Sequence, residues 1–346
     1  MEPQIILAGT LRRDYILPRI GRPLLDVPGG GLLYAVAGAS VWTQAHGLGI
    51  GLLGRVGEDY PHEWLRSFVK RGFNVEGIRI LPGHLDLRAF RAYQDPSVVA
   101  SGQTRGDVQR SNPVAHFARL GLPYPKSLFG YQPPVDRTGS RAPAPDTPHP
   151  ADIPASYRGA RLVHICPLDH LTGSRLVTTF RQAGVKVVTL DPSAALMAPA
   201  MLDEVSTLLH GLTAFMPAEE ELRALFWSRS DDPWEMVEAL AAFGCEFIVV
   251  KCGGRGQMLY DAASKKRWEI PAYPARLSDP TGMGDSFCGG FIAGLHQDYD
   301  PLRAVLCGNI SASLTIEGSG AFHALEVLPG LAQARLDSLA RTVRQV

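Results

Sequence analysis

Short apolar runs of strand length alternate with helix-like stretches through most of this 346-residue chain. The strand candidates are 4–9, 49–54, 161–166, 185–190, 212–217 and 246–251, and the helix candidates are 33–47, 62–72, 174–184, 219–226 and 233–244. Continuously apolar strands need cover on both faces, which amphipathic helices between them supply. The alternation predicts an α/β fold with a mostly parallel central sheet and helices on both faces. In such a sheet, ligands bind beyond the carboxyl ends of the strands.

Two regions depart from this alternation. Residues 87–94 (LRAFRAYQ) alternate with period two, as in a half-exposed strand, and could pair with 15–20 in a small extra sheet. Residues 122–154 contain nine prolines and little apolar periodicity, which predicts an extended or disordered surface insertion, not a packed element. Because the alternation resumes after residue 154, we expect one domain over 1–346.

Composition narrows the class of protein. Basic and acidic residues are equal at 34 each, so nothing favours nucleic acid or an anionic membrane as a partner. The five cysteines form no C-x-x-C pair, which argues against disulfides and zinc fingers and favours a reducing cytoplasm. No stretch has the roughly 18 apolar residues that a membrane span requires. We expect a soluble protein that acts on small molecules.

The stretch SDPTGMGDSFCGGF, residues 278–291, carries the strongest chemical signal. It follows a strand candidate and opens a helix of small residues. Glycine lets the backbone approach a ligand, and the first N–H groups of a helix have no partner inside it. These donors and the helix dipole favour an anion such as a transferring phosphoryl group. Asp285 would then remove the proton of an acceptor hydroxyl. The alternative is an ordinary helix start, where Asp285 supplies only N-terminal charge.

The same stretch closely resembles the C-terminal signature of the ribokinase-like (PfkB) carbohydrate kinases, D-T-x-G-A-G-D-x-F-x-G-G-F. The resemblance implies that Asp285 is the catalytic base and that Gly282, Met283 and Gly284 form an anion hole with it. Met283 replaces the usual alanine, which is tolerable because the backbone N–H is the group used. Asp279 and Thr281 match positions that in many relatives help to hold a monovalent cation such as K⁺, although Pro280 is unusual there.

Other segments resemble the family in the same order. GTLRRD (9–14) and PGGG (28–31) resemble its substrate-binding segments, which implies that Asp14, Gly29 and Gly30 hold the acceptor. KCGGRG (251–256) resembles the loop beside the nucleotide. The segment 307–321 resembles the helix that flanks the adenine. These matches imply that the nucleotide site is lined by Gly253, Gly256, Thr281 and Asn309.

Three departures from the family bear on the acceptor and the metal. Tyr34 replaces an Asn that contacts a substrate hydroxyl in many sugar kinases, which suggests a flatter or more apolar acceptor than ribose. Ala218 replaces the Asn of the N-x-x-E motif, whereas Glu221 keeps the acidic position linked to Mg²⁺; we therefore assign Glu221 and Asp279 to metal binding. Residues 191–197 lack the Arg or Asn often present after the aspartate.

Weaker patterns leave alternatives open. GIGLLG (49–54) matches G-x-G-x-x-G but lies inside a strand candidate, which disfavours an NAD site. HICPLDH (164–170) gathers residue types that can bind a metal, but a strand followed by an ordinary polar loop is the favoured explanation. Arg88 and Arg91 fit either lid surface or a substrate contact.

The sequence therefore predicts a ribokinase-like fold with a small β lid from residues near 14–28 and 85–105. The expected activity is Mg²⁺- and ATP-dependent phosphorylation of a hydroxyl on a sugar, polyol or nucleoside. Because relatives often pair through their lids, a homodimer formed in that way is also expected. The rival hypothesis is a ligand-binding or regulatory relative without catalytic activity, suggested by Tyr34, Ala218 and the proline-rich insertion.

Overall fold

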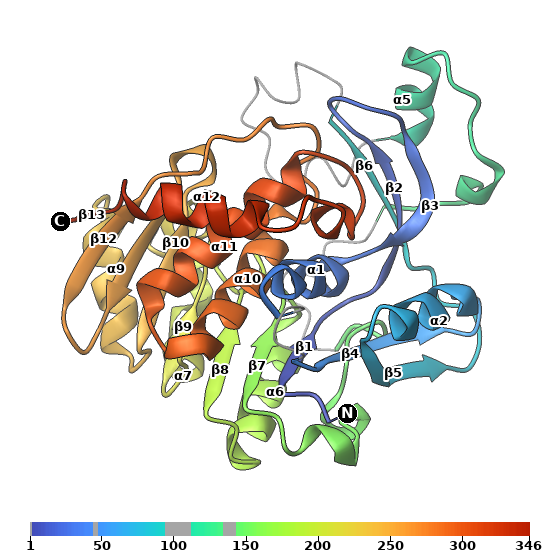
Figure 1. Ribbon diagram of the computed structural model, residues 1–346. Coiled ribbons are helices and arrows are strands. Elements are labelled where there is room, and N and C mark those ends of the chain that lie inside the picture. Colours follow the sequence, from blue (N-terminus) through green and yellow to red (C-terminus); the bar gives the residue numbers. More distant parts are fainter. Residues whose placement is uncertain (1, 44–47, 94–111, 134–142) are drawn as a thin grey trace.

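The computed structural model describes residues 2–43, 48–93, 112–133 and 143–346. Within them, ten strands form one large sheet in the order β13-β12-β11-β10-β9-β8-β7-β1-β4-β5 (Figure 1). Seven strands are parallel: β1 (Ile5–Ala8), β4 (Ile50–Gly57), β5 (Asn74–Leu81), β7 (Leu162–Ile165), β8 (Val187–Leu190), β9 (Ala214–Phe215) and β10 (Phe247–Lys251). Three antiparallel strands complete one edge: β11 (Gln257–Asp261), β12 (Lys266–Ile270) and β13 (Arg344–Gln345).

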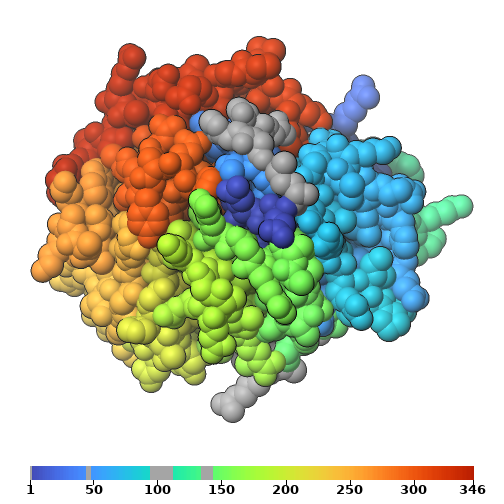
Figure 2. Space-filling model, turned by 60° about the horizontal axis from the view of Figure 1, so that its bottom comes forward, coloured from blue at the N-terminus to red at the C-terminus, as the bar shows by residue number. Residues whose placement is uncertain are grey.

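Helices cover both faces of this sheet. One layer contains α1 (Gly31–Thr43), α2 (His62–Lys70), α10 (Met283–Asp298), α11 (Pro301–Ile316) and α12 (Leu331–Ala340); the other contains α6 (His170–Gln182), α7 (Leu202–Leu209), α8 (Glu219–Leu225) and α9 (Pro233–Ala242). The alternation along β1 shows the division: Ile5 and Leu7 join the first core, whereas Ile6 and Ala8 join the second. The predicted mostly parallel sheet between two helical layers is confirmed. In Figure 2 the N-terminal residues, in blue, lie between the orange and cyan segments.

Short 3-10 helices connect several of these elements. They are η2 (Lys126–Leu128), η3 (Pro150–Asp152), η4 (Ala155–Tyr157), η5 (Pro199–Met201), η6 (Gly253–Arg255) and η7 (His323–Leu325). In the described part of the chain, no helix is both long and apolar enough to cross a membrane.

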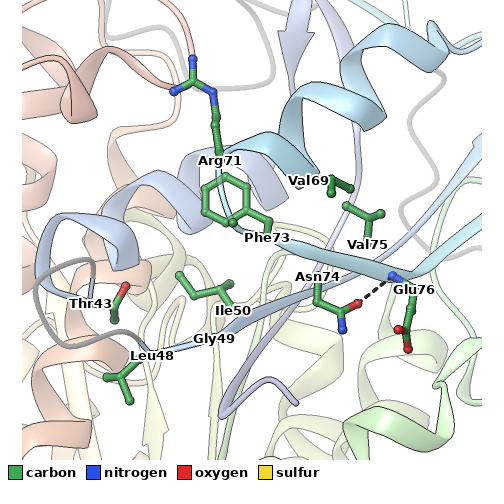
Figure 3. A pocket seen from close by; sticks show the side chains of 11 residues that line it. Thr43, Leu48, Gly49, Ile50, Val69, Arg71, Phe73, Asn74, Val75 and Glu76 are labelled. Carbon is green, nitrogen blue, oxygen red and sulfur yellow. Dashed lines mark hydrogen bonds between the residues drawn. The ribbon is translucent and has the colours of Figure 1, made fainter. Parts of the chain in front are cut away.

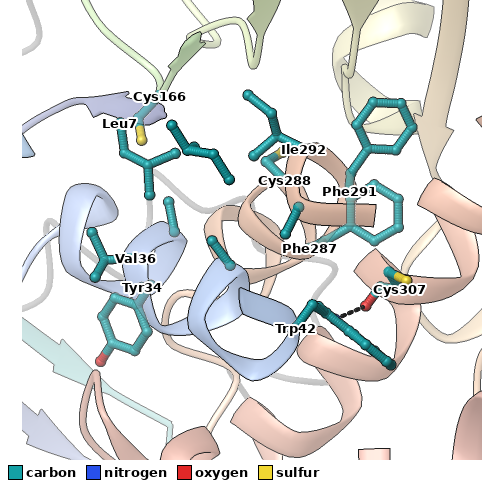
Figure 4. Close-up of a cluster of buried hydrophobic side chains, with 14 of the residues drawn as sticks. Leu7, Tyr34, Val36, Trp42, Cys166, Phe287, Cys288, Phe291, Ile292 and Cys307 are labelled. Atoms are coloured by element: carbon teal, nitrogen blue, oxygen red, sulfur yellow. Dashed lines mark hydrogen bonds between the residues drawn. The ribbon is translucent and has the colours of Figure 1, made fainter. Parts of the chain in front are cut away.

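The close packing of α1 on α10 builds the core behind the strand ends. A Cβ at Gly38 would collide with the backbone of Ser286, and one at Gly289 with the backbone of Ala35. Glycine at these positions therefore brings the two helix backbones together. Figure 4 shows the cluster between them, where the indole N–H of Trp42 donates to the carbonyl of Cys307 at 3.1 Å.

A separate three-stranded sheet, which we call the lid sheet, lies beside the large one. It consists of β2 (Arg12–Leu17), β3 (Leu24–Gly29) and β6 (Arg88–Ala92), in the order β3-β2-β6. β2 and β6 are parallel and in register, with Tyr15 opposite Phe90, which confirms the predicted pairing of 15–20 with 87–94. The part of the expected lid beyond Tyr93 lies outside the described residues.

Much of the proline-rich region is packed, contrary to the sequence prediction. α5 (Pro113–Arg119) and residues 122–131 cover one face of the lid sheet; we call them the lid cover. Buried Phe117, Leu128 and Tyr131 pack there against Tyr15 and Phe90. The prediction was wrong because it weighed the prolines more than the apolar residues between them. Proline fixes turns such as η2, which follows Pro125, without preventing the intervening side chains from packing. Residues 134–142 of the region lie outside the described residues.

Candidate active site

The helix start at residues 282–285 faces the carboxyl ends of the parallel strands. Gly282 precedes α10 with a φ of 72°, a left-handed conformation that glycine adopts without strain. The Ser286 N–H donates to the Gly282 carbonyl at 2.8 Å, whereas the Met283 N–H makes a longer bond of 3.3 Å to the Pro280 carbonyl. Asp285 lies in the first turn and is 8% exposed. The sequence-predicted combination of glycine turn, helix N-terminus and carboxylate is therefore present in one place.

The glycines at 29–31 lie between two carboxylates. A Cβ at Gly29 would collide with the carboxylate of Asp14, and a Cβ at Gly31 would lie 2.8 Å from Oδ1 of Asp285. Gly30 has a φ of 94°, and a Cβ there would press on the backbone of residues 10–12. This glycine run thus brings the end of β3, the start of α1 and both aspartates together.

Asp14 is fixed by a residue to which the sequence had given two alternative roles. Nη1 of Arg91 lies 2.9 Å from Oδ1 of Asp14, and the Asp14 side chain is 1% exposed. Oδ2 of Asp14 has no hydrogen-bond partner among the described residues. Arg91 is therefore neither lid surface nor a lone substrate contact: it neutralises the buried carboxylate and orients its second oxygen.

Tyr34 lies between this carboxylate and residues 278–285, which we call the anion loop. Its ring packs on Gly282, where a Cβ would collide with the ring carbons, and Figure 4 shows its oxygen directed away from the apolar cluster. The residue is 2% exposed, and its hydroxyl also lacks a hydrogen-bond partner within the described chain. Burial, reinforced by the negative charge of Asp14, raises the Tyr34 pKa well above its ordinary value, so the hydroxyl is a neutral donor.

The loop before α10 connects this region to the lid sheet. Oδ1 of Asp279 accepts the Thr281 N–H at 2.9 Å, and the Thr281 hydroxyl lies 3.3 Å from that of Tyr93, just beyond β6. The Ile20 N–H donates to the Ser278 carbonyl at 3.2 Å. Burial raises the pKa of Asp279, whose Oδ2 has no hydrogen-bond partner in the described residues. The lid sheet is thus in direct contact with the anion loop.

The residues predicted to line the nucleotide site differ in their surroundings. Gly253 and Gly256 both adopt positive φ, and only Gly256 is crowded, by the backbone at Ile270. Asn309 is 3% exposed, and its side chain bonds Gln257, the Pro271 carbonyl and the Tyr273 N–H at 2.7–2.9 Å. The predicted direct contact of Asn309 with the nucleotide therefore needs correction, because these bonds commit its amide to holding the 271–273 segment.

The predicted metal residues do not converge on one cluster. Oε2 of Glu221 accepts the Ala218 N–H at 2.8 Å and so caps α8. In the described ranges, no three His, Cys, Asp or Glu side chains are close enough together to hold a metal ion. His164 instead bonds the Thr189 hydroxyl at 2.9 Å, and Asp169 caps α6. The strand-and-loop interpretation of 164–170 is the one that the structure supports.

A hollow of about 580 Å³ lies at the other end of the strands. Its walls come from the end of α1, the starts of β4 and β5, and the end of α2 (Figure 3). The bond drawn there joins the Asn74 side chain to the Glu76 N–H at 2.9 Å, an ordinary turn contact. Because β4 runs from Ile50 to Gly57, this hollow is separated from Asp285 by the length of the sheet. It is not part of the candidate active site.

The sequence missed a second ion pair at the strand ends. Nζ of Lys251, the last residue of β10, lies 2.6 Å from Oδ2 of Asp191, which follows β8. The Cys288 thiol of α10 lies 3.5 Å from the same carboxylate oxygen. A lysine ending an apolar strand was the available signal, but a partner 60 residues away was not.

Several curated relatives of the chain are named as kinases of nucleosides, sugars or inositol. It is 24% identical over 290 residues to a cytidine kinase of Thermococcus kodakarensis, covering 84% of this chain and 87% of the relative. It is 34% identical over 142 residues to a nucleoside kinase of Methanocaldococcus jannaschii, covering 40% and 43%. An inositol 3-kinase of Arabidopsis thaliana is 38% identical over 73 residues, 21% of this chain and 20% of that one.

Solved structures share the fold over nearly the whole chain. A putative ribokinase II of E. coli in complex with ATP and Mg²⁺ matches with a TM-score of 0.67 at 18% identity, covering 98% of this chain and 99% of that one. A Burkholderia thailandensis nucleoside kinase in complex with inosine matches with a TM-score of 0.66 at 18% identity, covering 97% and 98%. Residues 155–327 match the family described as pfkB family carbohydrate kinase. The chain, with its ribokinase-like fold, therefore belongs to the pfkB family of carbohydrate kinases.

Proposed function

We propose that this kinase transfers the terminal phosphoryl group of ATP, in the presence of Mg²⁺, to a hydroxyl of a nucleoside, sugar or polyol. The observation that carries the proposal is the meeting of Asp14 and Asp285 on opposite sides of the Gly29–Gly31 backbone. One carboxylate lies on the lid sheet and the other at an anion-binding helix start. An acceptor held by the first would present a hydroxyl to the second.

Asp285 acts as the general base in this proposal. Its carboxylate lies against Gly31, where a Cβ would be 2.8 Å from Oδ1, so the absence of a side chain at Gly31 leaves room beside it. Proton removal by a positioned carboxylate makes the acceptor oxygen nucleophilic as it approaches phosphorus. The residues that receive the phosphoryl charge are Gly282, Met283 and Gly284 with Asp285, through their backbone N–H groups at the positive end of α10.

In this proposal the acceptor is held by two polar atoms that have no hydrogen-bond partner among the described residues. Oδ2 of Asp14 can accept a hydrogen bond from a substrate hydroxyl, and the Tyr34 hydroxyl can donate one. Gly29 and Gly30 have no side chains, which lets their backbone pack closely against Asp14 and residues 10–12. The similarity to cytidine, nucleoside and inositol kinases supports an acceptor that carries several hydroxyls on a ring.

The nucleotide would lie across the loop that contains Gly253 and Gly256, with Thr281 beside its phosphates. Gly253 is exposed and has open space where a side chain would stand, so its backbone is accessible to a nucleotide. Asn309 supports this side indirectly through the 271–273 segment. ATP with Mg²⁺ supplies an activated phosphoryl group whose charge the metal partly neutralises.

The acidic residues present fit a weakly held Mg²⁺ better than a closed metal cage. Mg²⁺ commonly binds substrate phosphates, waters and one or two carboxylates. We assign Glu221, at the start of α8, to this ion through a bridging water. Oδ2 of Asp279 is buried and has no hydrogen-bond partner in the part of the chain that the structure describes, so we assign a K⁺-type site to Asp279 and Thr281.

The lid cover bears on the expected homodimer. α5 and residues 122–131 already occupy the face of the lid sheet that carries Tyr15 and Phe90. A dimer formed through the lid would therefore use the cover or the strand edges as its contact surface, and we propose no more than that.

The test is acceptor-stimulated consumption of ATP by the purified full chain. The panel would contain cytidine, inosine, adenosine, ribose and myo-inositol, each with Mg²⁺ and with or without K⁺. At least one acceptor should stimulate ADP release and appear as a phosphorylated product by mass spectrometry. If ATP binds but no acceptor on a widened sugar and polyol panel stimulates its use, the regulatory alternative is correct.

A further inference from the structure

Lys251 stands between the nucleotide-side loop and the anion loop. It ends β10, and the loop with Gly253 and Gly256 follows at once. Its ammonium lies 2.6 Å from Oδ2 of Asp191, which directly follows β8, and the two side chains are 11% and 1% exposed. The pair therefore lies at the carboxyl ends of two parallel strands, where ligands of such sheets bind.

The ammonium also reaches α10. Its Nζ lies 3.9 Å from Sγ of Cys288. Cys288 follows Asp285 by three residues, so both side chains project from one side of the helix. Helical side chains also tilt toward the N-terminus, which brings the thiol toward the first turn. Lys251 thus touches the second turn of α10, directly after the turn that carries the backbone donors at 282–285.

The stability of the fold does not by itself explain a charge at this position. Removing two ions from water is costly, and an apolar pair of similar size generally stabilises a core at least as well. The charge of Lys251 is felt further inside the sheet, because it adds to burial in lowering the pKa of His164. The Lys251 ammonium would have a function if the phosphates of a nucleotide extended from Gly253 to Gly282, because it would neutralise part of their charge.

We propose that the Lys251 ammonium binds the terminal phosphate of the nucleotide and that Asp191 is a positioning residue that holds the ammonium at the strand ends. This inference rests on the proposed function. An ammonium has three N–H donors, so it can keep one bond to Asp191 while donating another to a phosphate oxygen. It would then offset the negative charge that gathers at the helix start during transfer.

The test compares Lys251→Met, Lys251→Arg, Asp191→Asn and the double variant Asp191→Asn/Lys251→Met by calorimetry with ATP, ADP and adenosine. Lys251→Met should weaken ATP binding by about tenfold or more, while adenosine binding changes by less than about twofold. Lys251→Arg should retain most of the ATP affinity because it keeps the charge. Lys186→Met, an exposed lysine ahead of β8, is the matched control and should bind all three ligands as the wild type does.

The double variant separates a phosphate ligand from a structural ion pair. If the pair is only structural, removing both charges relieves the buried Asp191 and restores ATP affinity together with the melting temperature. If Lys251 binds phosphate, the double variant regains melting temperature but stays as weak toward ATP as Lys251→Met. Recovery of ATP binding, or equal losses for ATP and adenosine in Lys251→Met, would overturn the inference. A wild type that binds adenosine but not ATP would instead remove the proposed function itself.

Discussion

Nη1 of Arg91 lies 2.9 Å from Oδ1 of Asp14, and this buried ion pair joins β6 to β2 within the lid sheet. Breaking it leaves a carboxylate that is 1% exposed without its counter-charge. We expect Arg91→Met to lower the free energy of unfolding by about 3–5 kcal/mol, measured by chemical denaturation. Arg344→Met is the control: Arg344 is 75% exposed and lies 3.4 Å from Glu269, so its loss should cost about 0–1 kcal/mol. Equal effects of the two variants would contradict this reasoning.

Asp285→Asn tests the assignment of the general base. The amide keeps the shape of the side chain but cannot take a proton, so kcat should fall by about 10³-fold while ATP binding stays close to the wild-type value. Asp298→Asn, near the end of the same helix and beside Arg303, should leave kcat unchanged. A near-normal rate in Asp285→Asn would show that another group removes the proton.

Gly31→Ala tests the approach of α1 to that carboxylate. The added Cβ would lie 2.8 Å from Oδ1 of Asp285 and must displace it. A shift of about 1 Å in a reacting group can cost ~10²-fold in rate, so we expect a loss of that order in kcat without unfolding. Gly159→Ala is the control, because its only neighbour is a side-chain oxygen of Glu2 at 3.4 Å. Steady-state kinetics with circular dichroism would separate misplacement from misfolding.

Tyr34→Phe tests the donor at the acceptor site. The hydroxyl has no protein partner in the described chain, so removing it should not lower the free energy of unfolding. If it binds the acceptor, KM for that acceptor should rise by about tenfold, with a smaller effect on kcat. Tyr15→Phe removes a hydroxyl from the covered face of the lid sheet and should leave KM unaltered. An unchanged KM in Tyr34→Phe would restrict Tyr34 to shaping the pocket.

His164 predicts how stability depends on pH. Burial, with the nearby Lys251, lowers its pKa from 6.5 to about 3. Below pH 6.5 His164 is therefore protonated in the unfolded chain but stays neutral in the folded chain. The free energy of unfolding then decreases as the pH falls from 6.5 toward 3. The slope should be about 1.4 kcal/mol per pH unit. His164→Asn should flatten it in urea titrations at several pH values, whereas His62→Gln, at an exposed position, should not.

Regular elements with a strong local pattern were predictable from the sequence. The parallel strands other than β5, and the helices α1, α2, α6, α8 and α9, lie within about four residues of the expected ranges. The strands β5 and β11 and the helix α7 have no counterpart among the expected ranges. The lid cover was missed since its side chains are apolar only in irregular spacing.

The chemistry of the site was predictable where it is local and hidden where it is not. The helix start at 282–285 and the glycines at 29–31 are each a run of consecutive residues, so both can be recognised in the sequence. The pairing of Asp14 with Arg91 and of Asp191 with Lys251 joins residues 77 and 60 positions apart. Only the register of the strands brings those charges together. Asn309 shows the reverse: it was expected at the nucleotide, but its amide bonds Gln257 and the 271–273 segment.

The cover on the lid sheet changes what admission of a substrate would require. Phe117, Leu128 and Tyr131 pack on one face of the lid sheet, so separating the lid cover from the sheet would expose buried aromatic side chains to water. Any opening must therefore swing the strands and their cover as a single thick body. The hinge would lie at the two connections of the lid sheet, between β1 and β2 and between β3 and α1. Access would therefore depend more on the stiffness of these connections than on bending of the strands themselves.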